Sequence, residues 1–270
     1  MAFNPHPSHL KREDEKKIKP MEEEFGRIDG PNGRLAYRKL DGSGPAVVWL
    51  GGFRSDMKGT KAEALAAWAA QNRRAFLRFD YSGHGESDGD FRSGTISAWL
   101  ADARAAIERL TAGPLIVVGS SMGGWIAALA IPVLKNRIAG AVFIAPAPDF
   151  TEELVWKALT DGERAAILRD GEYVEKSQYS SEPNIITRAL IEDGRKHLIL
   201  GGAIDVECPV RIIQGMADPD VPWRHALKFA NLLRSQNVEL LLIKSGDHRL
   251  SKPHEIARIL NAVSSVQLGS

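Results

Sequence analysis

Residues 114–130 read Pro-Leu-Ile-Val-Val-Gly-Ser-Ser-Met-Gly-Gly-Trp-Ile-Ala-Ala-Leu-Ala, and this stretch decides the fold. Its first part, residues 114–118, is apolar and rich in β-branched residues, which predicts a buried strand. Its last part predicts the opening of a helix. Ser121 stands in the turn between them, with Gly119 and Gly123 two residues away on either side. This pattern is typical of a nucleophile elbow, in which a strained turn holds a serine hydroxyl clear of the sheet.

Steric constraints explain why glycine stands at both of these positions. The chain before and after such a serine passes close to itself, and a residue without a Cβ avoids the clash. The N-terminus of the following helix also points backbone N–H groups at the place where an oxyanion would form. Because Gly-x-Ser-x-Gly alone also arises by chance, the interpretation depends on whether an acid and a histidine follow in order.

The composition favours one large α/β domain. The chain has 270 residues, of which 44% are hydrophobic, enough for a sizeable core. Its 35 basic and 34 acidic residues leave a formal net charge of +1, which favours neither nucleic acid nor an anionic membrane as a partner.

The single cysteine, Cys208, excludes an internal disulfide. With no apolar leader and no long apolar run, we expect a cytoplasmic protein without membrane insertion, as a monomer or small homo-oligomer.

Strands alternate with helices along most of the chain, which predicts a mostly parallel central sheet flanked by helices. Residues 1–21 are polar and charged and are interpreted as an N-terminal arm. The core domain is expected over residues 22–145 and 210–265. Residues 146–209 interrupt the alternation and are too long for an ordinary crossover, so they predict a small helical lid inserted late in the sheet.

The lid is expected to contain two helices, over residues 152–169 and 183–198. A polar stretch with Tyr173 and Tyr179 separates them. Because the segment lies between two strands whose ends border the predicted site, it should cover Ser121. Its apolar side chains would then line one wall of a pocket for a modest acyl or aryl group.

Two further polar turns follow strands nearer the C-terminus. The predicted strand 210–214 is followed by Gly-Met-Ala-Asp-Pro-Asp-Val-Pro, which contains Asp218. The predicted strand 239–243 is followed by Lys-Ser-Gly-Asp-His, which ends at His248. The carboxyl ends of parallel strands share one edge of a sheet, so these two side chains can meet Ser121 there.

These three residue types form a catalytic triad in the order Ser, Asp, His. A serine hydroxyl is a poor nucleophile at neutral pH and needs a base. His248 can take the proton of Ser121 and pass it to the leaving group. Asp218 can hold the imidazole in the needed tautomer and stabilise the imidazolium.

The developing oxyanion needs two hydrogen-bond donors. One should be the backbone N–H of Met122, the residue after the nucleophile. The other should come from the turn after the predicted strand 46–50, where Gly51 and Gly52 let the backbone approach closely. The Phe53 N–H is the predicted second donor.

The chain resembles the serine hydrolases of the α/β-hydrolase superfamily over about residues 22–265. Besides the elbow, three motifs carry this resemblance: Asp-Tyr-Ser-Gly-His-Gly-Glu-Ser at residues 80–87, the acid turn at 215–222 and Gly-Asp-His at 246–248. Within the superfamily it is similar to small bacterial hydrolases and to the mitochondrial acyl-glucuronide esterase and palmitoyl-protein thioesterase type. One departure is Gly51, which stands where many members have histidine.

Other residues near these motifs leave alternatives open. Asp149 follows the preceding strand, where some members carry the acid, and Ser120 neighbours the nucleophile. Arg54, Trp125 and Trp156 are candidate pocket residues, although packing or surface roles are at least as well supported. No group of His, Cys and carboxylates has metal-ligand spacing, and the glycine pairs do not form a dinucleotide fingerprint, so neither a metal nor a cofactor is expected.

The sequence therefore predicts a hydrolase that cleaves an ester or thioester of a small soluble substrate through an acyl-enzyme. A peptidase or C–C bond hydrolase on the same triad remains an alternative. So does a receptor of the same fold that binds a ligand without turnover.

Overall fold

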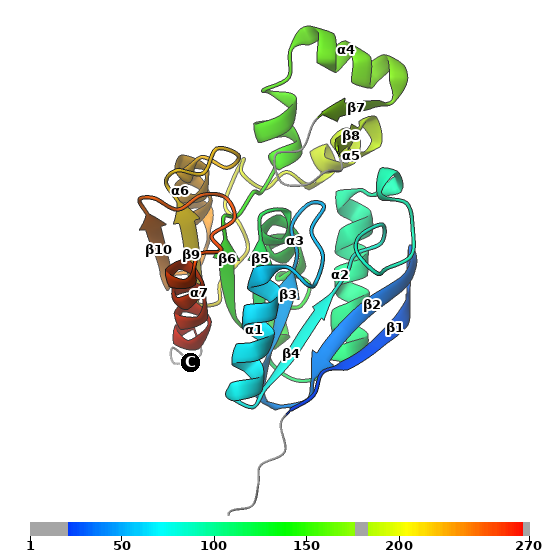
Figure 1. Ribbon diagram of the computed structural model, residues 1–270. Coiled ribbons are helices and arrows are strands. Elements are labelled where there is room, and N and C mark those ends of the chain that lie inside the picture. The colour runs from blue at the N-terminus through cyan, green and yellow to red at the C-terminus, as the bar shows by residue number, and fades with distance from the viewer. Residues whose placement is uncertain (1–20, 176–182, 267–270) are drawn as a thin grey trace, which may run out of the picture.

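Figure 1 shows the computed structural model, which describes residues 21–175 and 183–266. Within these ranges, eight strands form one sheet in the order β1-β2-β4-β3-β5-β6-β9-β10. β2 runs antiparallel to β1 and to β4, and all other neighbours are parallel, which confirms the mostly parallel sheet. The strands are β1 (Glu24–Gly30), β2 (Gly33–Leu40), β3 (Ser43–Leu50), β4 (Arg74–Phe79), β5 (Leu115–Ser120), β6 (Ile138–Ile144), β9 (Val210–Gly215) and β10 (Val238–Ile243).

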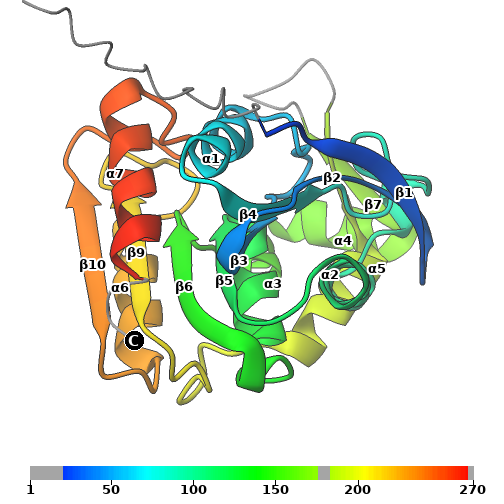
Figure 2. The ribbon, with the colours of Figure 1, turned by 90° about the horizontal axis from the view of Figure 1, so that it is seen from below.

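Helices cover both faces of the sheet, as the view from below in Figure 2 shows. Helices α1 and α7 pack on one face, and α2, α3 and α6 on the other. In β5, Leu115 and Val117 contact the cluster with α2 and α3, whereas Ile116 and Val118 contact the cluster with α1 and α7. This alternation explains why the strand is apolar throughout. The helices are α1 (Thr60–Gln71), α2 (Ile96–Leu110), α3 (Met122–Ala130), α6 (Trp223–Leu232) and α7 (Pro253–Ser265).

The segment between β6 and β9 lies beyond the carboxyl ends of the strands in Figure 1, but its internal structure differs from the prediction. Instead of two long helices, it holds short elements and a two-stranded antiparallel sheet of β7 and β8. The elements are the π-helix η3 (Thr151–Trp156), α4 (Asp161–Asp170), β7 (Glu172–Glu175), β8 (Asn184–Thr187), α5 (Arg188–Gly194) and the 3-10 helix η4 (Arg195–His197).

Local signals explain both errors in the lid. Thr160 caps α4 through a capping box with Glu163, so the expected helix 152–169 is divided there. The expected helix 183–198 begins instead as the β-branched run Ile185-Ile186-Thr187 of β8. The Thr187 side chain then accepts a hydrogen bond from the Leu190 N–H and caps α5.

Apolar side chains of the lid form a small core of their own. Ile167, Ile186 and Ile191 are buried together, with Trp156, Leu159 and Tyr173 packed against them. These side chains pack against one another and against Phe53 of the turn after β3, and none of them lines the cavity beside Ser121, contrary to the expectation. Tyr179 lies outside the described residues.

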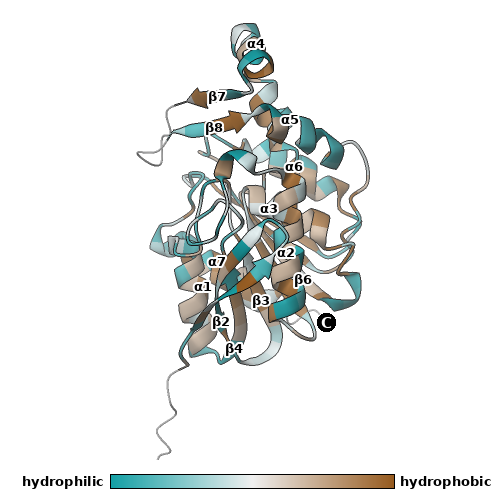
Figure 3. Ribbon diagram, turned by 90° about the vertical axis from the view of Figure 1, so that its right-hand side faces the viewer, coloured by the Kyte–Doolittle hydropathy of each residue, from teal (hydrophilic) through white to brown (hydrophobic). Residues whose placement is uncertain are grey.

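Hydropathy colouring in Figure 3 shows hydrophilic residues on α5 of the lid and a more apolar α3 beneath it. Among the residues that the structure describes, no helix has both the length and the apolar character needed to span a bilayer.

We predict that Gly123→Ala destabilises the protein although alanine is normally the better helix residue. A Cβ on Gly123 would overlap the carbonyl oxygens of Leu50 and Gly51, both of which are backbone atoms. The free energy of unfolding from denaturant titration should fall by about 1–3 kcal/mol or more. The control is Gly202→Ala, where a Cβ meets nothing within 4 Å; equal stability of the two variants would contradict this account.

Candidate active site

The turn after β5 has the backbone strain expected of a nucleophile elbow. Ser121 adopts φ 54° and ψ −121°, a conformation that L-residues rarely occupy. A Cβ on Gly119 would overlap the carbonyl of Gly123, so the two glycines allow the strand and the helix to cross. Ser121 directly precedes α3 as its N-cap residue.

The structure brings the three predicted triad residues together. The Ser121 hydroxyl lies 3.1 Å from Nε2 of His248, and Nδ1 of His248 lies 2.8 Å from Oδ2 of Asp218. Because the carboxylate can only accept, Nδ1 carries the proton and Nε2 is left with a lone pair facing Ser121. This tautomer is the one in which an imidazole can accept the serine proton.

Asp218 is buried and its carboxylate is held from both sides. Oδ1 accepts the N–H groups of Asp220 and Val221, each at 2.9 Å. Oδ2 accepts His248 and, at 3.1 Å, the side-chain amide of Gln214. Possible metal-ligand atoms of Asp218, Asp220 and His248 lie within 4.8 Å of one another. The hydrogen bond between His248 and Asp218 explains why these two side chains are in contact.

Gln214 is a supporting residue that the sequence reading missed. It is completely buried at the end of β9, where its amide also donates to the Val221 carbonyl at 3.0 Å. A polar residue directly after the apolar pair Ile212-Ile213 was the available signal, because a buried amide needs partners.

The turn after β3 lies against the elbow. A Cβ on Gly52 would lie 3.3 Å from the Ser121 Cβ, and the next residue, Phe53, lines the same cavity as Ser121. The Phe53 N–H has no hydrogen-bond partner among the described residues. Met122 is the first residue of α3, where N–H groups have no partner within the helix. Both predicted oxyanion donors are therefore available beside Ser121.

His84, which lies in the glycine-rich loop at residues 80–87, braces this turn. Its Nε2 accepts the Arg54 N–H at 3.2 Å, and its Nδ1 lies 3.3 Å from the Ser82 carbonyl, to which it can donate. Arg54 has φ 57°, so the bond holds a strained residue directly after Phe53. Burial lowers the pKa of His84 to about 4, which keeps the ring neutral and able to accept.

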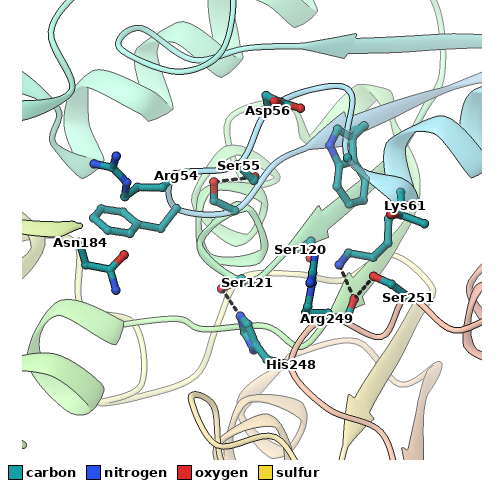
Figure 4. Close-up of a pocket in the computed structure, with 15 residues that line it drawn as sticks. Arg54, Ser55, Asp56, Lys61, Ser120, Ser121, Asn184, His248, Arg249 and Ser251 are labelled. Atoms are coloured by element: carbon teal, nitrogen blue, oxygen red, sulfur yellow. Dashed lines mark hydrogen bonds between the residues drawn. The ribbon is translucent and has the colours of Figure 1, made fainter. Parts of the chain in front are cut away.

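A cavity of about 410 Å³ opens beside Ser121 and His248. Figure 4 shows Arg54 and Asn184 on one side of the serine and Lys61, Arg249 and Ser251 on the other. Asn184 belongs to β8, and it is the one lid residue among the described residues that line the cavity.

Of the three candidate pocket residues, Arg54 lines the cavity, but Trp125 and Trp156 do not. Trp125 is completely buried, and its Nε1 donates to the His197 carbonyl at 3.1 Å. Trp156 packs in the lid core, with the Arg195 guanidinium 4.8 Å from its ring centre. Tryptophan is large enough to serve either role, and the sequence alone does not distinguish them.

The described part of the cavity wall carries more positive than negative charge. It includes the cations Arg54, Lys61 and Arg249 and one carboxylate, Asp56. Burial and the neighbouring Arg249 lower the pKa of Lys61 to about 8. Its ammonium donates to the Arg249 carbonyl at 2.5 Å and so connects α1 to the turn that holds His248.

Asp149, the alternative acid, is used elsewhere. Its buried carboxylate accepts the N–H groups of Ile199 and Leu200, both at 2.8 Å. It thereby joins the beginning of the lid to its end. Of the two serines at the elbow, Ser121 has its hydroxyl within hydrogen-bond distance of His248. Ser120, the alternative nucleophile, is buried at the end of β5.

A comparison with protein families matches residues 45–193 to the family described as serine aminopeptidase, S33. The chain belongs to this family of α/β-hydrolases. The mitochondrial palmitoyl-protein thioesterase ABHD10 of mouse is 34% identical to this α/β-hydrolase over 243 residues, which cover 90% of this chain and 81% of the mouse protein.

Two solved structures resemble this α/β-hydrolase closely. A putative hydrolase from Agrobacterium vitis S4 has a TM-score of 0.86 and 47% identity, and the match covers 92% of this chain and 99% of that one. Alpha/beta hydrolase domain-containing protein 10 from mouse has a TM-score of 0.83 and 31% identity, with coverage of 90% and 98%.

We predict that His84→Phe lowers kcat by roughly 10- to 100-fold, because the turn that carries the Phe53 N–H loses its brace. His84→Gln, which can still accept from Arg54, should restore part of the loss. Since His84 is already neutral well above its pKa of about 4, the shape of the pH–rate profile between pH 5 and 8 should not change. A shifted acid limb would mean that His84 itself titrates in the reaction, contrary to a bracing role.

Proposed function

We propose that this α/β-hydrolase is a serine hydrolase that cleaves a carboxylic ester or thioester of a small soluble substrate through an acyl-enzyme. The observation that carries the proposal is the hydrogen-bonded series Ser121–His248–Asp218, with distances of 3.1 and 2.8 Å. The two unpartnered N–H groups beside the serine support the same chemistry.

In the first half of the reaction, Ser121 Oγ attacks the carbonyl carbon while His248 Nε2 takes its proton. The carbonyl electron pair moves onto oxygen, and the N–H groups of Phe53 and Met122 stabilise this oxyanion. When the carbonyl reforms, the bond to the leaving group breaks. His248 protonates the departing oxygen or sulfur, and the acyl group remains on Ser121.

In the second half, water replaces the leaving group. His248 takes a proton from the water, whose oxygen attacks the acyl carbon and forms a second oxyanion in the same place. Collapse of this intermediate breaks the bond to Oγ, which recovers its proton from His248. The products are a carboxylic acid and free Ser121. Asp218 accepts the Nδ1–H throughout and stabilises the imidazolium.

The charge of the cavity bears on the alternatives. An aminopeptidase must bind a protonated amine, and the three cations at this wall disfavour one. The relatives described as palmitoyl-protein thioesterases support cleavage of an acyl bond to oxygen or sulfur. A receptor without turnover would bind the same esters, but would not become labelled on serine.

We predict that Ser121→Ala abolishes covalent labelling by a fluorophosphonate and all turnover beyond what binding and the oxyanion donors supply. Mass spectrometry of the labelled peptide identifies the modified residue. Ser120→Ala is the matched control and should still be labelled. Labelling that survives in Ser121→Ala, or is lost only in Ser120→Ala, would remove Ser121 from the mechanism.

We predict that Asp218→Asn lowers kcat by about 10⁴-fold, because an amide facing Nδ1 favours the wrong histidine tautomer. Asp149→Asn should reduce kcat far less, since Asp149 binds the Ile199 and Leu200 N–H groups of the lid. Steady-state kinetics on a short-chain ester measures both. The reverse order of the two losses would assign the acid to Asp149.

A further inference from the structure

The cavity end on the α1 side of Ser121 concentrates positive charge. Lys61 and Arg249 both line it, and the Lys61 ammonium donates to the Arg249 carbonyl at 2.5 Å, so the two residues are in contact. The charges of Asp247, Glu255 and Asp218 act on the pKa of Lys61 in the opposite sense to that of Arg249. Neither forms an ion pair with a carboxylate of the described residues. Two adjacent like charges repel each other, and an anion between them would relieve that repulsion.

The N-terminus of α1 adds to this field. Gly59, Thr60 and Lys61 line the cavity, and the N-cap Gly59 has no side chain to occupy the first N–H groups of the helix. Those N–H groups and the helix dipole favour negative charge at the N-terminus. α1 is 12 residues long, which is enough for a substantial dipole.

A buried donor at the same wall is independent of the helix. Trp49 lines the cavity and is only 4% exposed, yet its Nε1–H has no hydrogen-bond partner within residues 21–175 and 183–266. An unpaired buried N–H is destabilising, because it has lost its hydrogen bonds to water.

We propose that this end of the cavity is an anion-binding subsite, in which Lys61, Arg249 and the N-terminus of α1 hold a carboxylate or phosphate group of the substrate. The inference rests on the proposed function, since it gives the charge of the ester or thioester that Ser121 would attack.

The subsite is close enough to the reaction centre to bind part of the same molecule. Arg249 follows His248 in the chain, and the Lys61 ammonium contacts the Arg249 carbonyl. That carbonyl uses one of the three N–H donors of the ammonium. Asp56 is the opposing carboxylate of the described wall, but it is exposed and accepts the Lys58 N–H at 2.8 Å.

Matched esters test the proposal. For the acyl side, mono-para-nitrophenyl glutarate and para-nitrophenyl phosphonobutanoate are compared with neutral para-nitrophenyl pentanoate. For the leaving-group side, para-carboxyphenyl acetate is compared with phenyl acetate. For each pair we take the anionic-to-neutral ratio, which is kcat/KM for the anionic ester divided by kcat/KM for its neutral partner. In the wild type, this ratio should fall with added salt for at least one pair. The ester that shows this salt dependence tells whether the subsite binds a carboxylate or a phosphonate. It also tells whether that group belongs to the acyl part or to the leaving group of the substrate.

Lys61→Met and Arg249→Gln should each lower that anionic-to-neutral ratio by about tenfold, mainly through KM. The exposed residues Lys244 and Arg258 provide the control variants Lys244→Met and Arg258→Gln, which should keep the wild-type ratio. A ratio that is unchanged in Lys61→Met and Arg249→Gln, or changed equally by the control variants, would overturn the subsite.

Direct binding separates this inference from the proposed function. In Ser121→Ala, calorimetry should show the anionic ester binding more tightly than its neutral partner, and Lys61→Met in that background should abolish the difference. If the wild type hydrolyses no ester while this charge preference remains, the proposed function fails and the subsite stands. If esters are hydrolysed without any charge preference in rate or binding, the subsite fails alone.

Discussion

The close contact between the elbow and the end of β3 is the constraint on which the site depends. β3 and β5 pair in parallel up to Leu50 opposite Gly119, so the residues that follow each strand must share a small space. Glycine at position 123 lets the elbow lie against the carbonyls of Leu50 and Gly51, and Gly52, the next residue, lies close to Ser121. Strand register thus places the strained serine and the Phe53 N–H together, and His84 fixes the turn that carries them.

Sequence patterns predicted the fold and the residues that meet at the sheet edge, because both depend on short-range signals. Apolar runs marked the strands of a doubly covered sheet, whose carboxyl ends meet at one edge wherever the intervening chain goes. Ser121, Asp218 and His248 each follow such a strand and lie within hydrogen-bond distance in series. Their part in catalysis remains a prediction until the variants are measured.

What escaped prediction depends on long-range packing. The β-branched run of β8 is a local signal for a strand, but its partner β7 lies about a dozen positions earlier, and no local pattern connects the two. Nothing in the sequence around Trp156 indicates whether its side chain lines a cavity or packs in a local core. Lys61 lies at the start of α1, 188 positions from the Arg249 carbonyl that it contacts, and no pattern connects them.

Asp149 joins the beginning of the lid to its end by hydrogen bonds. The residues between these two points, which bear on substrate specificity, can therefore change independently of the catalytic centre. The Asp149 carboxylate binds the backbone of Ile199, 50 positions further on, so the chain between them leaves and returns at one point. Closing such a loop costs entropy that grows only slowly with length. Insertions, deletions or exchange of the intervening residues can therefore alter which molecules enter while the register of the sheet stays fixed. The fold thus has an interchangeable part whose two ends are tied together by one carboxylate, beside a core that need not change with it.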